Sequence, residues 1–527
     1  MKVVNTRVWI VWLSVLGASV LVFGCRDVPS QSDAIRVGVT HVPDHFDPRD
    51  ATDAISSRIN RLLYDRLVDL DEHAQPVPAL ATWEQRTPLQ YRFVLRAPRP
   101  TFHDGSPLTA WDVKATYESV LDPARLSPHR STLELIRRIE VSRDDVIDFV
   151  LDHPDPLFPH YLVIGILPAN LIARGHDFRR KPVGSGPFRL ERWIDDTRVR
   201  LIRRSDGQRI DIVRVPDPTV RALKLLAGEL DIVQNDLPPE LVAYLAEDDR
   251  LRIMRHHGTN FSYLGFHLQD PVTGQREIRQ AIAHAIDREG IIHFVLKDGA
   301  RLANAVFPPE HWAGHPALNG YPYDPDRARA LLTQAGYSPT RPVRITYKTS
   351  SDPFRLRLAT ILQQQLAAVG IDVAIHSHDW GTFYGDIKAG RFQMFSLAWV
   401  GVKTPDIFRY AFHSQSVPPH GANRGRLNDA RVDALIEQAE RAKTLQEKQA
   451  VYRTLQAVLL ESLPYVPLWY EDHVAIVRRE IVGYRLASDG NYDGLRSVRR
   501  RGITTRSLDR ESTASEERHA IGTMRRQ

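Results

Sequence analysis

Apolar positions along the chain follow two periods, and segments of the two kinds alternate. A period of two, which predicts strands, appears in three short segments: residues 35–39, 91–95 and 371–375. Spacings of three and four residues, which predict helices, appear in three longer ones: residues 110–120, 325–335 and 354–369. Suitable start and stop residues flank these helices: Thr109 with Asp112, Asp324 with Pro325, Gly336 and Gly370. Because the order helix, glycine, strand recurs, the pattern predicts an α/β protein.

The N-terminal segment has a different pattern. Lys2 and Arg7 precede an uncharged run, Val8–Phe23, which as a helix is about 24 Å long and shorter than a hydrocarbon core of about 30 Å. This pattern favours an export signal over a permanent span. Leu21 to Cys25 also resembles a bacterial lipobox, in which the cysteine is acylated and becomes the mature N-terminus.

We therefore predict a lipoprotein signal peptide over residues 1–24, lipid attachment at Cys25, and a polar tether over residues 25–34. The expected location is the periplasm or the cell surface, with the protein anchored to a membrane by its N-terminal lipid. Two alternatives stay open: ordinary cleavage near Ala18, and an uncleaved anchor with a free cysteine.

Charge and cysteine content exclude several classes of function. The formal charge is +6, but Lys2 and Arg7 contribute +2 and residues 499–527 a further +4, so residues 25–498 carry no net charge. A neutral body binds polyphosphates poorly, so we expect no nucleic-acid partner. The single cysteine excludes internal disulfides and cysteine-based metal clusters. Residues 499–527 are basic, poor in apolar residues and without a period, which predicts a disordered tail.

A series of segments, in order along the chain, resembles the large extracytoplasmic solute-binding proteins, family 5, of dipeptide and oligopeptide ABC transporters. The resemblance runs from about residue 35 to 498. Its segments are Phe46-Asp47-Pro48, residues 62–83, 91–123, PVGSGPFRLERW (182–193), 261–270, 278–292, 323–337, 358–375 and 447–470.

The resemblance implies a type II periplasmic-binding-protein fold, with two lobes that clasp the ligand and one extra domain. Because the chain passes repeatedly between lobes in this family, the domains are discontinuous in sequence. We expect the following limits: lobe I at 35–52, 185–262 and 472–498, the extra domain at 53–184, and lobe II at 263–471.

The function implied by the resemblance is that of a receptor for an ABC importer. Such a receptor captures a peptide or peptide-like solute in the cleft between its lobes and delivers it to the permease subunits and their ATPases. Capture requires closure around the solute and no bond-making. We expect a monomer without a cofactor, which is not an enzyme.

One segment that the family uses to bind peptides departs from the family pattern. The stretch from Trp399 resembles a family sequence that reads Trp, two residues, Asp, then a Pro-Asp pair. In peptide binders the first Asp holds the ammonium of the ligand, but here Val402 stands there, followed by Lys403. Asp406, from the Pro-Asp pair, either substitutes for it or caps the helix that follows.

Five other residues are candidates for binding the solute. Asn423 matches an asparagine in a cleft-facing loop of the family, and the neighbouring Arg424 is an addition suited to a carboxylate or phosphate. The alternative for Arg424 is a solvated side chain. Trp399, Trp380 and Tyr263 are candidates to line the cleft, although aromatic residues more often belong to the core.

Competing functions have weaker support. Gly184-Ser185-Gly186-Pro187 lacks the Gly-Lys-Ser/Thr ending of a nucleotide loop, so we interpret it as a tight turn that leads into a strand. No histidine pair completes a metal ligand set, and we predict no metal site. Other possibilities are a non-peptide solute (sugar, opine or metal complex), a secreted hydrolase, and a transcriptional sensor. A transcriptional sensor would need a basic helix-turn-helix at one terminus, but the N-terminus here resembles an export signal. A hydrolase would need two carboxylates at one bond, but the adjacent Asp195 and Asp196 point opposite ways on the expected strand and cannot share a scissile bond.

Overall fold

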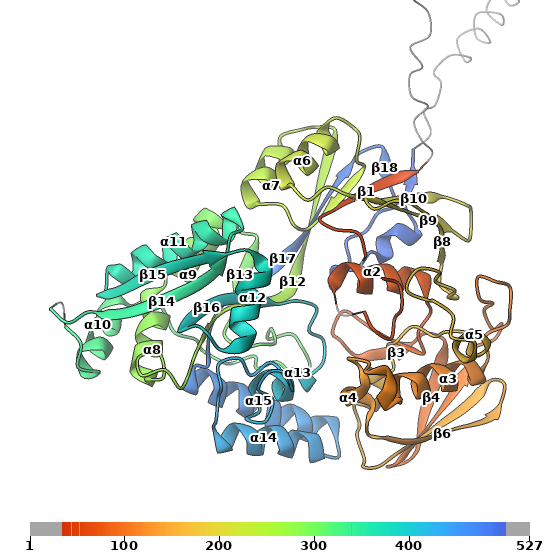
Figure 1. The fold of residues 1–527 in the computed structure, drawn as a ribbon, viewed down its shortest axis with the longest axis horizontal. Helices are drawn as coiled ribbons and strands as arrows, with labels where there is room; N and C mark the ends of the chain where they lie inside the picture. Colours follow the sequence, from red (N-terminus) through yellow and green to blue (C-terminus); the bar gives the residue numbers. More distant parts are fainter. Residues whose placement is uncertain (1–33, 44, 52, 339, 502–527) are drawn as a thin grey trace, which may run out of the picture.

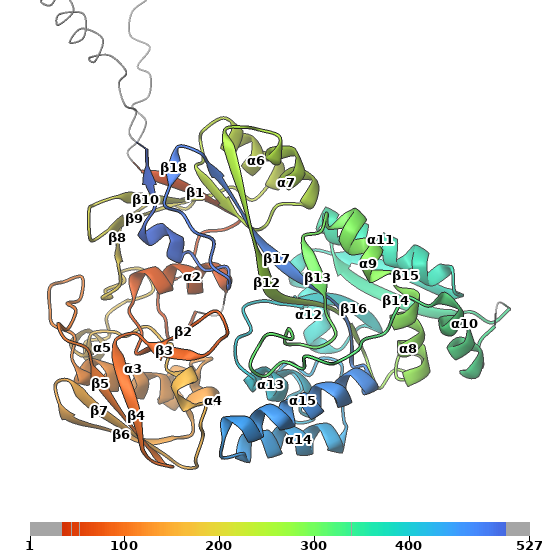
Figure 2. The same ribbon diagram turned by 180° about the vertical axis from the view of Figure 1, so that it is seen from behind.

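A computed structural model of the chain describes residues 34–43, 45–51, 53–338 and 340–501. The predicted signal peptide, Cys25, nearly all of the tether and most of the basic tail lie outside these residues. Within the described ranges, no helix combines the length and the apolar character needed to cross a membrane. Figure 1 and Figure 2 show the fold from opposite sides.

Two long antiparallel strands, β12 (Leu251–Phe266) and β17 (Tyr465–Arg478), form the middle of one continuous eleven-stranded sheet. They pair from Leu251 with Arg478 to Gly265 with Tyr465, with a register shift between His256 and Asn260. Both strands run from one half of the sheet into the other (Figure 1). The predicted limits at 262/263 and 471/472 fall inside these two strands.

The half of the sheet on the N-terminal side, with the helices that cover it, is called the first lobe here. Its strands are β1 (Ile35–Val39), β8 (Phe188–Asp195), β9 (Arg198–Arg203), β10 (Arg209–Arg214) and β11 (Ile232–Gln234). One core packs the sheet against helices α6 (Pro218–Leu226) and α7 (Pro239–Ala246), and the other packs it against α2 (Ala54–Leu63). The predicted limit at 52/53 therefore separates α2 from the core in which it is buried.

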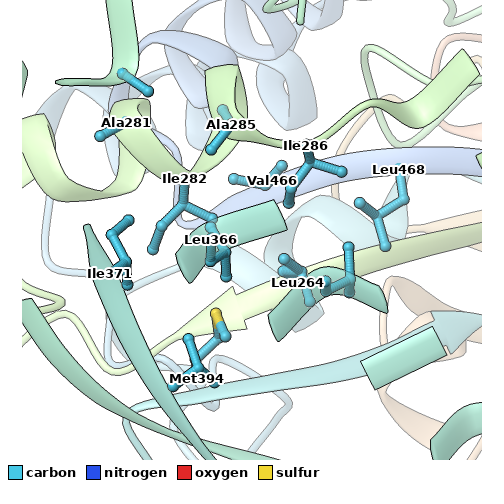
Figure 3. Close-up of a cluster of buried hydrophobic side chains, with 14 of the residues drawn as sticks. Leu264, Ala281, Ile282, Ala285, Ile286, Leu366, Ile371, Met394, Val466 and Leu468 are labelled. Atoms are coloured by element: carbon cyan, nitrogen blue, oxygen red, sulfur yellow. The ribbon is translucent and has the colours of Figure 1, made fainter. Parts of the chain in front are cut away.

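The other half, with its helices, is called the second lobe. Its strands are β13 (Ala300–Leu302), β14 (Val343–Ser350), β15 (Ile371–His378) and β16 (Met394–Trp399), with the ends of β12 and β17. One face packs against α8 (Arg276–Ala285), α10 (Pro325–Gln334) and α11 (Pro353–Ala367). The opposite face packs against α12 (Trp380–Ala389), α13 (Asp406–Phe412), α14 (Ala430–Arg441) and α15 (Leu445–Ser462). Figure 3 shows the first of these cores, where Leu264 and Met394 point from the sheet toward Ile282 and Leu366.

A separate four-stranded antiparallel sheet forms the core of the extra domain. Its order is β4 (Ala81–Thr87), β5 (Gln90–Leu95), β7 (Val146–Leu151) and β6 (Ile136–Arg143). Helix α3 (Ala110–Leu121) packs on this sheet, and a hairpin of β2 (Val68–Leu70) and β3 (Pro76–Pro78) lies beside it. The short helices of the described residues are η1 (Pro123–Arg125), α4 (Arg130–Leu133), η2 (Phe158–Tyr161), α5 (Ala169–Ala173), α9 (Arg288–Gly290), η3 (Ile291–Val295) and η4 (Asp493–Arg496).

The predicted α/β class and the six predicted elements are confirmed. The backbone N–H of Thr109 donates to Asp112 at the start of α3, and the backbone N–H of Arg327 donates to Asp324 at the start of α10. Gly370 adopts a φ of 97°, which suits it to the turn between α11 and β15.

The predicted limits of the tether and the tail are wrong by one or two residues. Ala34, assigned to the tether, is buried. The tail was expected to begin at Arg499, but β19 (Arg499–Arg500) pairs with β18 (Ile481–Val482). Arg500 forms ion pairs with Asp231 and Glu480. The basic residues at the start of the tail therefore have acidic partners elsewhere in the chain, which composition alone did not reveal.

Residues 184–187 form the turn that leads into β8, and the two glycines of this turn pack closely against the end of helix α2. A Cβ atom on Gly184 would lie 2.1 Å from the carbonyl oxygen of Leu63, and the N–H of Gly186 donates to that oxygen at 2.9 Å. Only residues without a side chain allow this approach of two backbones. The turn thereby holds the C-terminal end of α2 in place in the first lobe.

We predict that Gly184→Ala lowers the free energy of unfolding by about 2 kcal/mol, because the added methyl group forces the two backbones apart. Gly385→Ala is the matched control: nothing lies within 4 Å of its added Cβ atom in helix α12, so stability should be unchanged or rise by about 1 kcal/mol. Denaturant unfolding of both variants provides the measurement. Equal stability of the two variants would show that the close approach does not constrain α2.

Candidate ligand-binding site between the lobes

Two deep cavities lie where helix α2 faces the second lobe. The first cavity has a volume of about 590 Å³ and lies between α2, η2, the loop 400–406 and the loop 489–491. The second cavity has a volume of about 530 Å³ and lies between α2, the ends of β11 and α7, and strands β12 and β17. Ala54, Arg58 and Val400 line both, so the cavities meet at α2. Each has the size of a small-molecule site.

Helix α2 presents a charged side chain to these cavities because its other face is anchored. Asp53 caps the helix by accepting from the N–H of Ser56 at 2.8 Å, and Ile55, Ile59 and Leu62 are buried in the core of the first lobe. Arg58 lies at the edge of this apolar face and is 9% exposed. A rigid helix therefore fixes the position of its guanidinium group.

The loop 400–406 carries the second set of charges in the first cavity. Lys403 forms an ion pair with Asp489, which comes from the opposite wall of the cavity. Burial alone would raise the pKa of Asp489, but the ammonium of Lys403 and the guanidinium of Arg61 lower it well below its usual range. The ion pair thus links the second lobe to the C-terminal segment of the first lobe.

Asp406 reaches the first cavity from the first turn of α13. The Thr404 hydroxyl donates to its carboxylate, and no cation is paired with it among the described residues. Its side chain is exposed to the space between the lobes, and the partial loss of water beside the cavity walls raises its pKa. Pro405, rather than Asp406, holds the N-cap position. The Asp406 carboxylate nevertheless accepts hydrogen bonds from the backbone N–H groups of Asp406 and Ile407 in the first turn, so both predicted roles of Asp406 stay predictions.

Two histidines lie beside this loop in the neutral form. The ring nitrogens of His160, which lines the first cavity, have no described hydrogen-bond partner. Burial lowers its pKa to about 4. Burial also lowers the pKa of His311 to about 4, and a ring nitrogen of His311 lies 3.0 Å from the carbonyl oxygen of Lys403. These rings add no charge to the cavity at neutral pH.

One pair of opposite charges on the wall of the second cavity is compensated within the protein. Arg355 forms an ion pair with Glu471 at 3.0 Å, and the Ser262 hydroxyl donates to the same carboxylate at 2.8 Å. Burial alone would raise the pKa of Glu471, but Arg355 and the hydrogen bonds from Ser262 and Trp469 together lower it below its usual range. This pair closes the wall at the point where β17 passes between the lobes.

Of the six residues predicted to bind the solute, Asp406 alone lies on a wall of either cavity. Four others form an aromatic cluster with Tyr384: Tyr263, Trp399, Trp380 and Arg424. The guanidinium of Arg424 donates to the hydroxyls of Tyr263 and Tyr384 at 3.2 and 3.1 Å and lies 4.8 Å from the Trp399 ring centroid. Its buried position contradicts the predicted alternative of a solvated side chain, and the binding of a carboxylate or phosphate by Arg424 stays a prediction.

Asn423 and Trp380 also differ from the sequence interpretation. The side chain of Asn423 is bonded to the backbone of its own loop, at His413 and Leu427. Its polar atoms are therefore used to shape the loop. Trp380 is 59% exposed and stacks on Tyr384 with ring centroids 5.4 Å apart.

Sequence reasoning missed Arg58, His160, Lys403 and Asp489 as cavity residues. For Arg58 a signal existed, since a charged residue interrupts the spacing of Ile55, Ile59 and Leu62. For Asp489 no local signal existed, because its partner lies on a different lobe. Among the described residues no three His, Cys, Asp or Glu side chains are placed to hold a metal ion.

The fold and the cavities define a class of protein. Two lobes joined by long shared strands, with cavities between them, are the architecture of proteins that bind a ligand by closing around it. The model of the bacterial extracellular solute-binding proteins, family 5 (middle region), matches residues 75–417. The chain therefore belongs to the family 5 bacterial extracellular solute-binding proteins.

Relatives and solved structures agree with this membership. Di/tripeptide-binding protein 2 of Pseudomonas aeruginosa is 29% identical over 87% of this chain and 94% of its own length. The ABC transporter-associated periplasmic binding protein DppA of Helicobacter pylori, solved with the peptide STSA, is 25% identical, with a TM-score of 0.75 over 89% of this chain and 98% of its own. NikZ of Campylobacter jejuni, solved with Ni(L-His), is 24% identical, with a TM-score of 0.78 over 89% of this chain and 99% of its own.

We predict that Lys403→Met lowers the free energy of unfolding by about 1 kcal/mol at neutral pH, because it removes the ion pair with Asp489. The folded-state pKa of Asp489 lies below the unfolded value, so the difference from the wild type should shrink as the pH falls below the ordinary pKa of aspartate. Unfolding at several pH values measures this. Lys443→Met, at an exposed lysine outside both cavities, is the control and should show no such dependence. A pH-independent loss at Lys403 would argue against the ion pair.

Proposed function

We propose that the chain is the receptor of an ABC importer, which captures a peptide or peptide-like solute between its lobes and delivers it to the membrane permease. The two cavities at α2 carry this proposal, since together they lie between the lobes and offer charges of both signs. The relatives named for di- and tripeptides support peptides as the solute class. In this proposal the receptor is a monomer that binds one kind of small ligand, and it breaks no bond of the solute.

Asp406 is the proposed partner of the solute's ammonium group. Val402 replaces the aspartate that peptide binders of the family use, and the neighbouring Lys403 is already paired with Asp489. Asp406 is an acidic group on the wall of the first cavity without a cationic partner among the described residues. An ammonium placed there would stabilise the ionised form of a carboxylate whose pKa burial raises.

A non-peptide solute is the second candidate, and the replacement at Val402 favours it. Without the usual aspartate, a free N-terminus has one fewer counter-charge than in the family's peptide binders. Structural neighbours have been solved with Ni(L-His) and with agropinic acid, at 24% and 22% identity, so the same fold serves both solute types. A hydrolase has no support in the cavities: Asp195 accepts from Thr197 in the turn after β8, away from both.

The test is a titration of the protein with a set of di- and tripeptides, followed by tryptophan fluorescence, with the peptides weighed afterwards by mass spectrometry. We expect saturable binding of peptides that are recovered unaltered. Cleaved peptides would support a hydrolase, and binding of an opine or a metal–histidine complex without any peptide would support the second candidate.

Asp406→Asn should weaken binding of a peptide with a free N-terminus about ten-fold, and leave the N-acetylated peptide unaffected. In the wild type, affinity for the free peptide should fall as the pH falls through the raised pKa of Asp406, because the carboxylate must be ionised to pair with an ammonium. Asp326→Asn, at an exposed site on α10, is the control. An equal loss for both peptides would assign Asp406 a structural role.

We also propose that Cys25 is acylated and anchors the receptor to the membrane. The support is the lipobox-like sequence and the short apolar run before it. An anchored receptor stays close to its permease, which raises the rate of delivery.

Cys25→Ser should move the protein from the membrane fraction to the soluble fraction of the producing cells, since the lipid can no longer be attached. Fractionation followed by immunoblotting measures the distribution, and Ser30→Ala, in the predicted tether, is the control. Unchanged membrane attachment of the Cys25 variant would indicate an uncleaved N-terminal helix instead.

A further inference from the structure

The structure describes seven buried arginines, and the chain gives six of them partners suited to a guanidinium group. Their hydrogen-bond partners are carboxylates for Arg49 and Arg203, backbone carbonyls for Arg221, Arg279 and Arg288, and tyrosine hydroxyls for Arg424. Arg58 is the seventh. Among the described residues it has neither a carboxylate nor a carbonyl partner.

Tyr492 is the polar neighbour that the structure describes for Arg58. The guanidinium carbon lies 5.6 Å from the Tyr492 ring centroid, and the guanidinium group donates a hydrogen bond to the Tyr492 hydroxyl. Nearby acids are engaged elsewhere: Asp489 pairs with Lys403, and Asp493 pairs with Arg61. Asp236 lies on the wall of the second cavity but forms no ion pair with Arg58.

A buried cation is costly unless it is paired or fully hydrogen-bonded. Each of the other six arginines has a carboxylate, several backbone carbonyls or two tyrosine hydroxyls, whereas the one hydrogen-bond partner described for Arg58 is the hydroxyl of Tyr492. Arg58 faces open space rather than protein, because it lines both cavities at the point where they meet. The donors of the guanidinium group that Tyr492 does not use are therefore available to a partner in the cavity. The planar fork of a guanidinium group matches a carboxylate, which accepts two parallel hydrogen bonds.

We propose that Arg58 is the subsite that binds a carboxylate of the solute. This inference rests on the proposed function, and it makes the class of solute more specific. Asp406 and Arg58 then provide the first cavity with one acidic and one basic group that no described side chain of opposite charge neutralises. A solute with an ammonium at one end and a carboxylate at the other, such as a short peptide with free termini, complements both.

Helix α2 suits this role because it holds Arg58 without help from a salt bridge. Asp53 caps the helix, and its apolar stripe lies in the core of the first lobe. The opposite wall, with Val400, belongs to the second lobe. A carboxylate on Arg58 would thus be held at the boundary between the lobes, where closure removes it from water and strengthens the contact.

The experiment is isothermal titration calorimetry with the tightest-binding peptide of the set and with the same peptide as its C-terminal amide. In the wild type the amide should bind about ten- to one-hundred-fold more weakly. Arg58→Met should bind the free acid more weakly by a similar factor and no longer distinguish acid from amide. Arg58→Lys should recover part of the preference, and Arg252→Ala, at an exposed arginine of β12 outside both cavities, should keep all of it.

A second readout separates binding from packing. Without solute, Arg58→Met should unfold at the same or a higher temperature than the wild type, because it removes an uncompensated buried charge. A lower unfolding temperature, together with equal losses for acid and amide, would make Arg58 a structural residue and overturn the inference while the proposed function stands.

If no peptide binds the wild type, the peptide form of the proposed function fails, and free succinate becomes the probe for Arg58. Stabilisation of the wild type by succinate, lost in Arg58→Met, would still support a carboxylate subsite. Absence of any succinate effect would overturn it.

Discussion

The pairing of β12 with β17 determines how the whole molecule is built. These two strands are longer than either half of the sheet requires, and their hydrogen bonds continue across a register shift from the first lobe to the second. The other strands of this sheet continue from one side or the other: β11 and β1 on one, β16 and β14 on the other. Because two strands alone join the halves, the lobes share a backbone connection but not a common core, and cavities remain between them.

Electrostatics inside these cavities follows from the same arrangement. Charges that face each other across the boundary, such as Lys403 and Asp489, compensate each other only while the lobes are together. Charges without such a partner, Arg58 and Asp406, are placed on elements anchored in different lobes, α2 and α13. A solute of matching charges would supply contacts to both lobes at once, which is what favours the closed form over the open one.

The sequence was sufficient for the fold class, for the six elements with clear periods, and for the family. It was insufficient for the cavity walls, because these depend on contacts between residues hundreds of positions apart. Asp406 was found because it lies in a family motif, whereas Arg424 and Asn423, in equally suggestive positions, have their polar groups bonded within the protein. The predicted domain limits fell inside β12 and β17 for the same reason: the local sequence pattern does not reveal that one strand belongs to both lobes.

The central claim is that the solute lies enclosed between the lobes, in the first cavity, between Asp406 and Arg58. A crystal structure of the protein grown with its tightest-binding peptide tests this most directly. The account predicts electron density for the peptide along the wall formed by α2 and the loop 400–406, with its ends at those two side chains. Density on the aromatic cluster of Trp380, Tyr384 and Trp399, with the first cavity filled by water alone, would contradict it.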